Sequence, residues 1–236
     1  MKPTQKTVVI TGGTGGLGRA VVAAFLADGA RVWTNYRRED RFQDLQQAVS
    51  ASPALQGISA DLTDEEQVQQ FFDRVLQVDG HVDVLIHLTG GFWMGGEIAD
   101  TPLGKWDAMM RLNLLTTFLC TRKAFQVMKQ QLGGRIFTVA SRTALDLPAG
   151  MGAYSVSKAG VIALTQVLAN EGKAYNITAN VILPSIIDTP ANRQAMPDAD
   201  YSKWVTPEDI ARLLVQLCRD DIRSLSGTEI KMYGKL

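Results

Sequence analysis

Three side chains in the second half of the chain have the chemistry to protonate an oxygen atom: Ser141, Tyr154 and Lys158. Tyr154 and Lys158 are four residues apart, so on a helix they present a phenol and an ammonium to the same small volume. A phenol normally titrates near pH ~10, but a neighbouring cation stabilises the phenolate and brings the pKa toward the working range. The pattern predicts a general acid, with the Ser141 hydroxyl as a second hydrogen-bond donor.

A glycine-rich segment near the start of the chain predicts what this acid works beside. Residues 11–18, Thr-Gly-Gly-Thr-Gly-Gly-Leu-Gly, follow an apolar strand-like run and precede a helical one. Glycines at 12, 16 and 18 allow a tight turn and a close approach of the backbone to a pyrophosphate, which accepts hydrogen bonds from the helix N-terminus. This strand–loop–helix setting favours a dinucleotide-binding loop.

Composition limits the other partners of such a protein. The 236 residues are 46% hydrophobic and 20% charged, which suits one domain with a large core. Twenty-four basic residues balance twenty-four acidic ones, so no global field attracts nucleic acid or an anionic membrane surface. We expect no signal peptide, membrane helix or metal site. The two cysteines lie far apart in helical patterns, which argues against a disulfide framework and favours the cytoplasm.

Strand-like apolar runs alternate with helical periodicity along almost the whole chain. The predicted strands are Thr7–Thr11, Arg31–Asn35, Leu55–Ser59, Val84–Leu88, Arg135–Ala140, Thr178–Leu183 and Glu229–Met232. The predicted helices are Leu17–Asp28, Asp40–Ser50, Asp64–Val78, Pro102–Gln131, Ala153–Tyr175 and Pro207–Arg219. The alternation predicts an α/β fold of the Rossmann type, a doubly wound parallel sheet flanked by helices, in a single domain over residues 1–236. Ligands of such sheets bind at the carboxyl ends of the strands, where the strand order reverses.

These features, in this order, resemble the short-chain dehydrogenase/reductase family over essentially the whole chain. The glycine-rich segment resembles the family's cofactor motif, and Asp61 resembles its adenine-contacting acid after the third strand. Asn113, with the serine, tyrosine and lysine above, resembles the catalytic tetrad. Residues 180–190 resemble the segment that covers the nicotinamide. The resemblance implies hydride transfer between a nicotinamide and a carbonyl or hydroxyl carbon.

The resemblance also implies a role for each site residue. Negative charge builds on oxygen as hydride reaches a carbonyl carbon, so a proton from Tyr154 and a hydrogen bond from Ser141 stabilise the transition state. Lys158 holds the ribose hydroxyls, and Asn113 orders a water that connects Lys158 to solvent. Singly, each residue has an ordinary structural explanation, and only the set favours catalysis. The implied cofactor contacts are Gly12, Thr14, Gly16, Leu17, Gly18, Arg37, Arg38, Asp61, Leu62, Thr89, Gly90, Tyr154, Lys158, Pro184, Ile187 and Thr189.

The end of the second predicted strand decides the choice of cofactor. Sites for NAD usually place a carboxylate there to bind ribose hydroxyls, whereas an arginine accommodates the phosphate of NADP. This chain has Trp-Thr-Asn-Tyr-Arg-Arg at 33–38, which favours NADP(H) through Arg37 or Arg38. The alternative is that both arginines are solvated and pair with Glu39 or Asp40. Gly15 supplies no second basic residue where many NADP-binding relatives have one.

The chain departs from the family pattern after the fourth predicted strand. It has His87-Leu88-Thr89-Gly90 where the family commonly has Asn-Asn-Ala-Gly. Leu88 cannot make the amide hydrogen bonds that tie neighbouring strands together, so we expect His87 or Thr89 to take over some of them. A histidine at an apolar strand end is more often a satisfied structural residue than a catalytic one.

Several large side chains should reach the mouth of the site. The predicted substrate-pocket residues are Phe92, Trp93, Leu145, Met196 and Trp204. They favour an apolar small-molecule substrate, although aromatic residues at such positions can also simply pack a lid. By family resemblance we expect a homotetramer, in which the long apolar helices at 102–131 and 153–175 pack against symmetry mates.

Two other functions remain open at this point. Our first hypothesis is an NADPH-dependent carbonyl reductase similar to 3-oxoacyl-acyl-carrier-protein reductases. Residues 90–96 and 188–204 resemble dihydropteridine reductases, but Ser141 and Arg37 fit that alternative less well. From a different class, a dinucleotide-sensing protein without turnover would keep the fold. The complete acid, lysine and serine set argues against it, because a sensor needs none of them.

Overall fold

The computed structural model describes residues 5–222 and 224–236. Seven parallel strands form one sheet in the order β3-β2-β1-β4-β5-β6-β7. The strands are β1 (Thr7–Thr11), β2 (Arg31–Tyr36), β3 (Leu55–Ser59), β4 (Val84–His87), β5 (Gly134–Val139), β6 (Ile177–Pro184) and β7 (Glu229–Met232). The α-helices are α1 (Gly16–Ala27), α2 (Glu39–Ala48), α3 (Glu65–Asp79), α4 (Leu103–Met109), α5 (Thr116–Gln131), α6 (Thr143–Asp146), α7 (Gly152–Gly172), α8 (Pro190–Ala195) and α9 (Pro207–Leu217). The predicted doubly wound α/β fold is confirmed.

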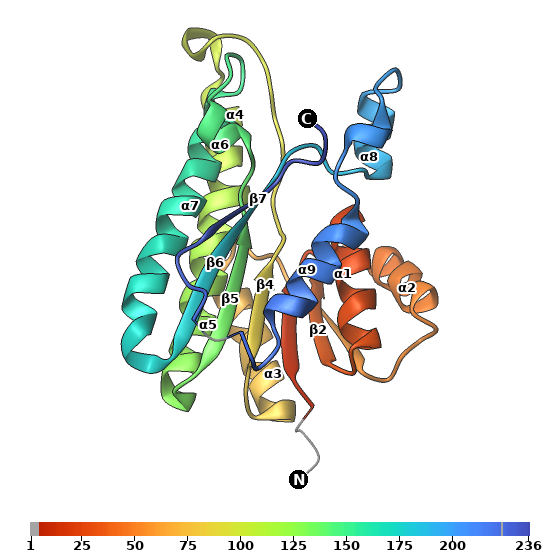
Figure 1. The fold of residues 1–236 in the computed structure, drawn as a ribbon, viewed down its shortest axis with the longest axis vertical. Coiled ribbons are helices and arrows are strands. Elements are labelled where there is room, and N and C mark those ends of the chain that lie inside the picture. Colours follow the sequence, from red (N-terminus) through yellow and green to blue (C-terminus); the bar gives the residue numbers. More distant parts are fainter. Residues whose placement is uncertain (1–4, 223) are drawn as a thin grey trace.

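Helices cover both faces of the sheet (Figure 1). Val9 and Leu85 pack toward α3, α5 and α7, whereas their neighbours Val8 and Val84 pack toward α1, α2 and α9. Successive side chains of a strand point to opposite faces, so a strand buried on both sides is apolar at most of its positions. This explains why the strands appear in the sequence as continuous apolar runs. No helix in the described part of the chain has the length and apolar character needed to span a bilayer.

The predicted helix over residues 102–131 is interrupted. Between α4 and α5 the backbone forms a π-helical turn, η2 (Met110–Leu115). The Thr116 hydroxyl donates to the carbonyl of Leu112 at 2.7 Å, and the Thr117 hydroxyl donates to that of Asn113 at 2.5 Å. These side chains satisfy carbonyls at a place where the regular helical ladder is disturbed. The shorter elements α6, α8 and the 3₁₀ turns η1 (Ile98–Asp100), η3 (Lys173–Tyr175) and η4 (Tyr201–Lys203) were not predicted.

The order of the strands fixes where a ligand can bind. From β1 the chain winds outward to β2 and β3, then crosses back to place β4 on the other side of β1. The loops that leave β1 and β4 therefore diverge, and in sheets of this kind the ligand crevice lies between such loops, at the carboxyl edge of the strands. In Figure 1 this edge lies at the upper ends of the strands, with α8 above it on one side and α4 and α6 on the other.

Candidate active site

The loop after β1 leaves backbone amides free at the start of α1. Gly12 has a φ of +69°, and its carbonyl accepts from the amide of Gly15 at 3.0 Å. A Cβ on Gly18 would collide with that same carbonyl, so close packing requires glycine there. Gly15 precedes the first helical residue and offers no side chain to cap the helix. The first amides of α1 therefore point toward the crevice without an intrahelical acceptor, an arrangement suited to phosphate.

One hydroxyl in the crevice has no partner. The side-chain oxygen of Thr89 is buried, and no described residue forms a hydrogen bond with it. It faces the phosphate loop, since a Cβ built on Gly12 would lie 3.2 Å from it. On the other side of the loop, Thr189 packs on Gly16 and accepts a hydrogen bond from the amide of Asn192 at the start of α8. A buried unpaired hydroxyl costs free energy, so this site fits a ligand with polar groups.

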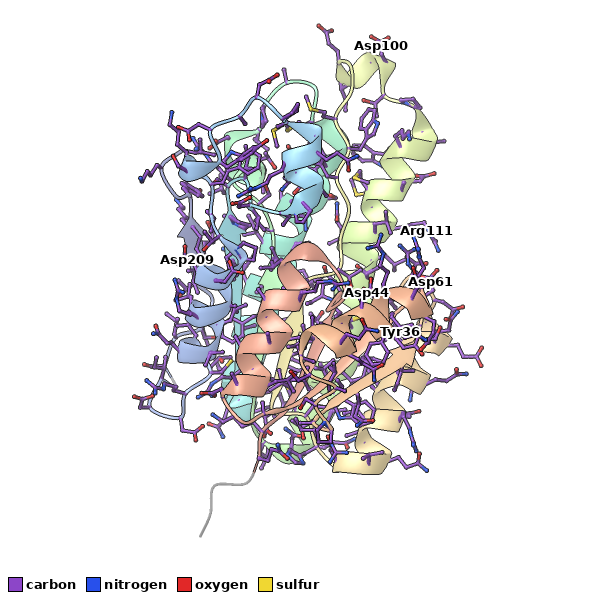
Figure 2. All side chains as sticks on the ribbon, turned by 90° about the vertical axis from the view of Figure 1, so that its right-hand side faces the viewer. Tyr36, Asp44, Asp61, Asp100, Arg111 and Asp209 are labelled. Atoms are coloured by element: carbon purple, nitrogen blue, oxygen red, sulfur yellow. The ribbon has the colours of Figure 1, made fainter. Side chains whose placement is uncertain are left out.

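Residues from β2, β3 and η2 meet at the end of the crevice where adenosine is expected. Asp61 accepts from the amide and the hydroxyl of Thr63, both at 2.9 Å, through a single carboxylate oxygen. The amide of Ala60 donates to the carbonyl of Tyr36 at 3.0 Å. Figure 2 shows Tyr36, Asp61 and Arg111 on one flank of the molecule, and Arg111 donates to the carbonyl of Thr63 at 3.5 Å. No described residue donates a hydrogen bond to the second carboxylate oxygen of Asp61, which makes that oxygen available to a ligand.

The two arginines after β2, Arg37 and Arg38, differ in whether they form an ion pair. Arg38 forms a forked ion pair with Asp40, with Nε to Oδ1 at 3.0 Å. This pair holds the pKa of the Asp40 carboxyl below its ordinary value. Arg37 is exposed and forms no hydrogen bond or ion pair with any described residue. The alternative of a locally paired arginine thus holds for Arg38, whereas Arg37 is available to an anion.

Ser141, Tyr154 and Lys158 come together at the carboxyl end of β5. Ser141 accepts from the hydroxyl of Thr143 at 3.0 Å, so its own proton is free to point toward Tyr154. Burial raises the pKa of Tyr154, and a hydrogen bond with Ser141 lowers it in part. Lys158 donates to the carbonyl of Val139 at 2.8 Å, and burial lowers its pKa to about 8. The pKa of the Tyr154 phenol is therefore raised, whereas the sequence predicted that it would be lowered. The reason is that burial outweighs the interactions that stabilise the phenolate.

Asn113 connects the loop after β4 to helix α7. Its amide oxygen accepts from the backbone amide of Gly91 at 2.8 Å, and its nitrogen donates to the hydroxyl of Ser157 at 2.9 Å. Ser157 in turn donates to the carbonyl of Tyr154 at 2.7 Å. A Cβ on Gly90 would lie 2.7 Å from Asn113 Oδ1 and 3.2 Å from Lys158 Nζ, so all these groups share one small space. The sequence interpretation missed Ser157, although its place beside Lys158 on the same helix was a usable signal.

His87 holds β1, β4 and α5 together. Its Nδ1 lies 3.0 Å from the hydroxyl of Thr11, and its Nε2 lies 3.2 Å from that of Thr116. The Thr11 oxygen already accepts from the amide of Leu88, so its proton goes to Nδ1. The Thr116 proton goes to the carbonyl of Leu112, so Nε2 carries the hydrogen of the ring. These assignments require a neutral imidazole.

The electrostatics of His87 agree with this tautomer. Burial first, and the charge of Lys158 second, lower the pKa of the imidazole to about 3. The ring is therefore neutral over the ordinary working range and has both nitrogens occupied. This geometry supports the structural interpretation of His87, with the ring taking the place of amides that tie the strands.

Known proteins share sequence similarity with this chain over most of its length. Residues 6–200 match the family model for short chain dehydrogenases. The chain belongs to this family. It is 27% identical to a 3-oxoacyl-acyl-carrier-protein reductase of Thermotoga maritima, covering 100% of this chain and 99% of the relative. It is 30% identical to a D-beta-hydroxybutyrate dehydrogenase of Cupriavidus necator, covering 97% and 96%.

Solved structures agree with the sequence relatives. ElxO with NADP bound superposes with a TM-score of 0.92 at 26% identity, covering 98% of each chain. A short-chain type dehydrogenase/reductase from Mycobacterium ulcerans gives a TM-score of 0.92 at 27% identity, covering 98% of this chain and 89% of the other. The protein is thus an NAD(P)-dependent dehydrogenase/reductase that acts on CH–OH or C=O groups of small molecules.

The predicted substrate-pocket residues of this short-chain dehydrogenase differ in how exposed they are. The ring of Phe92 contacts that of Tyr154, with centroids 4.9 Å apart, and Leu145 lies exposed after Ser141. Trp93 and Met196 are half-buried. Trp204 is only 6% exposed and packs against the ring of Tyr201, so it supports the segment around α8 and offers little open surface. No three His, Cys, Asp or Glu side chains in the described ranges gather as a possible metal-ligand set.

Proposed function

We propose that this protein is an NADPH-dependent reductase of a carbonyl group in a small, predominantly apolar substrate. The observation that carries the proposal is the meeting of Ser141, Tyr154 and Lys158 beside a loop with free helix-terminal amides. A proton donor next to a dinucleotide site is what reduction of a carbonyl requires.

The cofactor contacts are proposed from the shape of the crevice. The first amides of α1, at Gly16, Leu17 and Gly18, suit the pyrophosphate, and Asp61 with Leu62 suits the adenine. Thr89 supplies a hydroxyl that needs a partner. The remaining proposed contacts to the nicotinamide half are Gly90, Pro184, Ile187 and Thr189. When bound, the cofactor supplies the hydride. Arg37 favours NADPH over NADH because its guanidinium is free to pair with a phosphate.

The protein's own groups divide the remaining chemistry among them. The Tyr154 hydroxyl donates its proton to the substrate oxygen, where negative charge develops, and Ser141 donates a hydrogen bond to the same atom. The ammonium of Lys158 stabilises the phenolate that remains. Asn113 holds the amide of Gly91 and thereby fixes the loop that covers the reacting groups.

The substrate class follows from the residues around the phenol. Phe92 offers exposed apolar surface against Tyr154, and Leu145 is exposed on α6 shortly after Ser141, which suits an acyl chain or a ring attached to the carbonyl. Relatives named as 3-oxoacyl-acyl-carrier-protein reductase and D-beta-hydroxybutyrate dehydrogenase favour a ketone–alcohol pair of this kind.

Oxidation of NADPH against a panel of 3-oxoacyl thioesters, simple ketones and quinonoid pterin tests the proposal. Tyr154→Phe should bind NADPH nearly as well as the wild type but turn over at least about 100-fold more slowly, the scale for loss of a general acid. Tyr175→Phe, at the far end of the same helical region, is the control and should keep its rate. Near-wild-type turnover by Tyr154→Phe would contradict the proposed acid, and reduction of the pterin alone would contradict the substrate class.

We also propose that the protein is a homotetramer that uses α5 and α7. Phe118 on α5 is 41% exposed and Val167 on α7 is 50% exposed, so both helices keep apolar side chains outside the core. Val161, on the helix predicted at 153–175, is fully buried and packs within the protomer. Exposed apolar positions on two neighbouring long helices favour burial against another copy.

A further inference from the structure

Asn35, near the end of β2, joins the ends of three strands. Its side chain is 7% exposed. The amide oxygen accepts from the backbone amide of Gly12 at 3.0 Å, and the amide nitrogen donates to the carbonyl of Ala60 at 3.2 Å. Gly12 begins the phosphate loop after β1, and Ala60 immediately precedes Asp61 after β3. One side chain therefore fixes the phosphate end and the adenosine end of the crevice relative to each other.

The next amide of the loop is held in a similar way. Gly13 donates to the hydroxyl of Thr34 at 3.1 Å, and a Cβ on Gly13 would collide with that side chain. The amides of Gly12 and Gly13 are thus both occupied by side chains of β2. They are not available to a phosphate, which leaves the first turn of α1 for that purpose. The position of this turn depends on how firmly β2 holds the start of the loop.

The two partners of Asn35 demand a carboxamide. A backbone amide requires an acceptor and a backbone carbonyl requires a donor, and a carboxamide supplies one of each without charge. An aspartate has the same shape but carries two acceptors, so one carboxylate oxygen would face the carbonyl of Ala60. Its charge would also stand two residues from Arg37, where a phosphate would be bound. The residue type thus combines a structural requirement with an electrostatic one.

We propose that Asn35 is a positioning residue that sets the selectivity of the site for the phosphorylated dinucleotide. The inference rests on the proposed function, because it concerns the same cofactor site. Asn35 fixes the phosphate loop and the residues around Asp61 in position relative to Arg37. Because Asn35 is neutral, it places no competing anion at the phosphate-binding end of the site.

Dissociation constants for NADPH and NADH, measured by fluorescence with purified variants, test this role. Asn35→Asp should lower the preference for NADPH over NADH at least about tenfold relative to the wild type, because the added charge opposes only the extra phosphate. Asn35→Ser, which is neutral but too short to bridge both partners, should weaken both cofactors by similar factors of about fivefold or more. The unfolding temperature of each cofactor-free variant is recorded alongside.

Asn180 offers a matched control. It is a buried carboxamide in β6 that accepts from the amide of Thr228 at 3.1 Å and donates to the carbonyl of Leu225 at 2.9 Å, both in the segment before β7. Asn180→Asp should lower the unfolding temperature and leave the ratio of the two dissociation constants unchanged, because the nicotinamide that its segment is expected to cover is common to both dinucleotides. An unchanged ratio in Asn35→Asp, or an equal change in Asn180→Asp, overturns the inference.

Two further outcomes remain decisive. If Asn35→Asp does not fold, unchanged dissociation constants in Asn35→Ser overturn the inference. If the wild type binds neither dinucleotide, the proposed function itself is wrong, and the selectivity role is wrong with it. A wild type that binds both dinucleotides, together with an Asn35→Asp variant that keeps the wild-type ratio, rejects only the role of Asn35.

Discussion

The ring of Phe92 stands nearly perpendicular to the ring of Tyr154, with 76° between the planes and 4.9 Å between the centroids. Phe92 is also 58% exposed, so the same side chain contacts the proposed acid and opens onto solvent. We therefore expect a substrate that brings its oxygen to the phenol to contact this ring.

Replacement of Phe92 by alanine should lower kcat/KM for apolar ketones about tenfold, because it removes the apolar surface beside the reacting oxygen. The dissociation constant of NADPH should stay the same, since no proposed cofactor contact is changed. Met94→Ala, an exposed position in the same loop, is the control. Steady-state kinetics with short and long ketones checks the prediction, and equal losses in both variants would remove the special role of Phe92.

Replacement of Arg37 by aspartate should weaken NADPH binding roughly tenfold to hundredfold and move the preference toward NADH. Arg37 is free of local partners among the described residues, so its charge is available to the phosphate. Arg38→Ala is the matched variant, because Arg38 is already paired with Asp40, and its effect should be several-fold smaller. Dissociation constants for both cofactors decide the matter. If the Arg37→Asp/Arg38→Ala double variant keeps the wild-type preference for NADPH over NADH, the phosphate binds elsewhere.

The strands were predictable because both faces of the sheet are buried, which makes runs such as Val8 to Ile10 apolar at each position. The glycine loop and the Tyr154–Lys158 pair were predictable because their function requires particular residue types at fixed spacing. The interruption at η2 was not, because its sequence, Met-Arg-Leu-Asn-Leu-Leu, contains no proline or glycine that would mark a break in the helix. The interruption is evident only in the folded structure, in which Asn113 lies within η2.

Long-range contacts account for the other differences. Asn35 appeared in the sequence only as a neutral residue before two arginines, and its partners Gly12 and Ala60 are distant in the chain. The raised pKa of Tyr154 likewise reflects burial by surrounding elements, which spacing alone cannot report. Residue types predict which groups react, whereas burial in the folded protein sets the pKa values of those groups.

Assembly can be tested through the exposed apolar side chains of α5 and α7. The double variant Phe118→Glu/Val167→Glu should change the mass in light scattering from about four times the 25.7 kDa chain to smaller species. A charge placed in an apolar interface loses its hydration without gaining a partner. Val78→Glu, a similarly exposed apolar site on α3, should leave the mass unchanged. A monomer mass for the wild type at micromolar concentration would contradict the tetramer.

Acid should destabilise the fold through His87. Its pKa falls from 6.5 to about 3 in the folded protein, so the unfolded chain binds more protons between these values. Stability is then fully present above about pH 6.5 and is lost as the pH falls toward 3. From about pH 7 to about pH 5, the wild type should lose about 2 kcal/mol more unfolding free energy than His87→Asn. Urea unfolding at both pH values measures this, and parallel losses would show that His87 does not titrate as described.

The buried ammonium of Lys158 should make the cofactor-free protein less stable than a variant without the charge. Its pKa falls from 10.5 to about 8, so the folded protein binds fewer protons than the unfolded chain between these values. Stability therefore rises with pH over this window and is lowest below about pH 8, where the charge is fully buried. This lowering of the Lys158 pKa corresponds to a cost in unfolding free energy on the order of 3 kcal/mol for burying the ammonium.

Lys158→Met should therefore raise the unfolding free energy near neutral pH by about 1–3 kcal/mol, after loss of the hydrogen bond to Val139, while abolishing turnover. Its advantage should shrink as the pH approaches about 10, where the wild-type lysine is neutral. Lys173→Met, at an exposed position, is the control and should show neither effect. Urea unfolding without cofactor at neutral and alkaline pH checks this. A Lys158→Met protein less stable than the wild type at neutral pH would mean that the ammonium is better solvated than its burial implies.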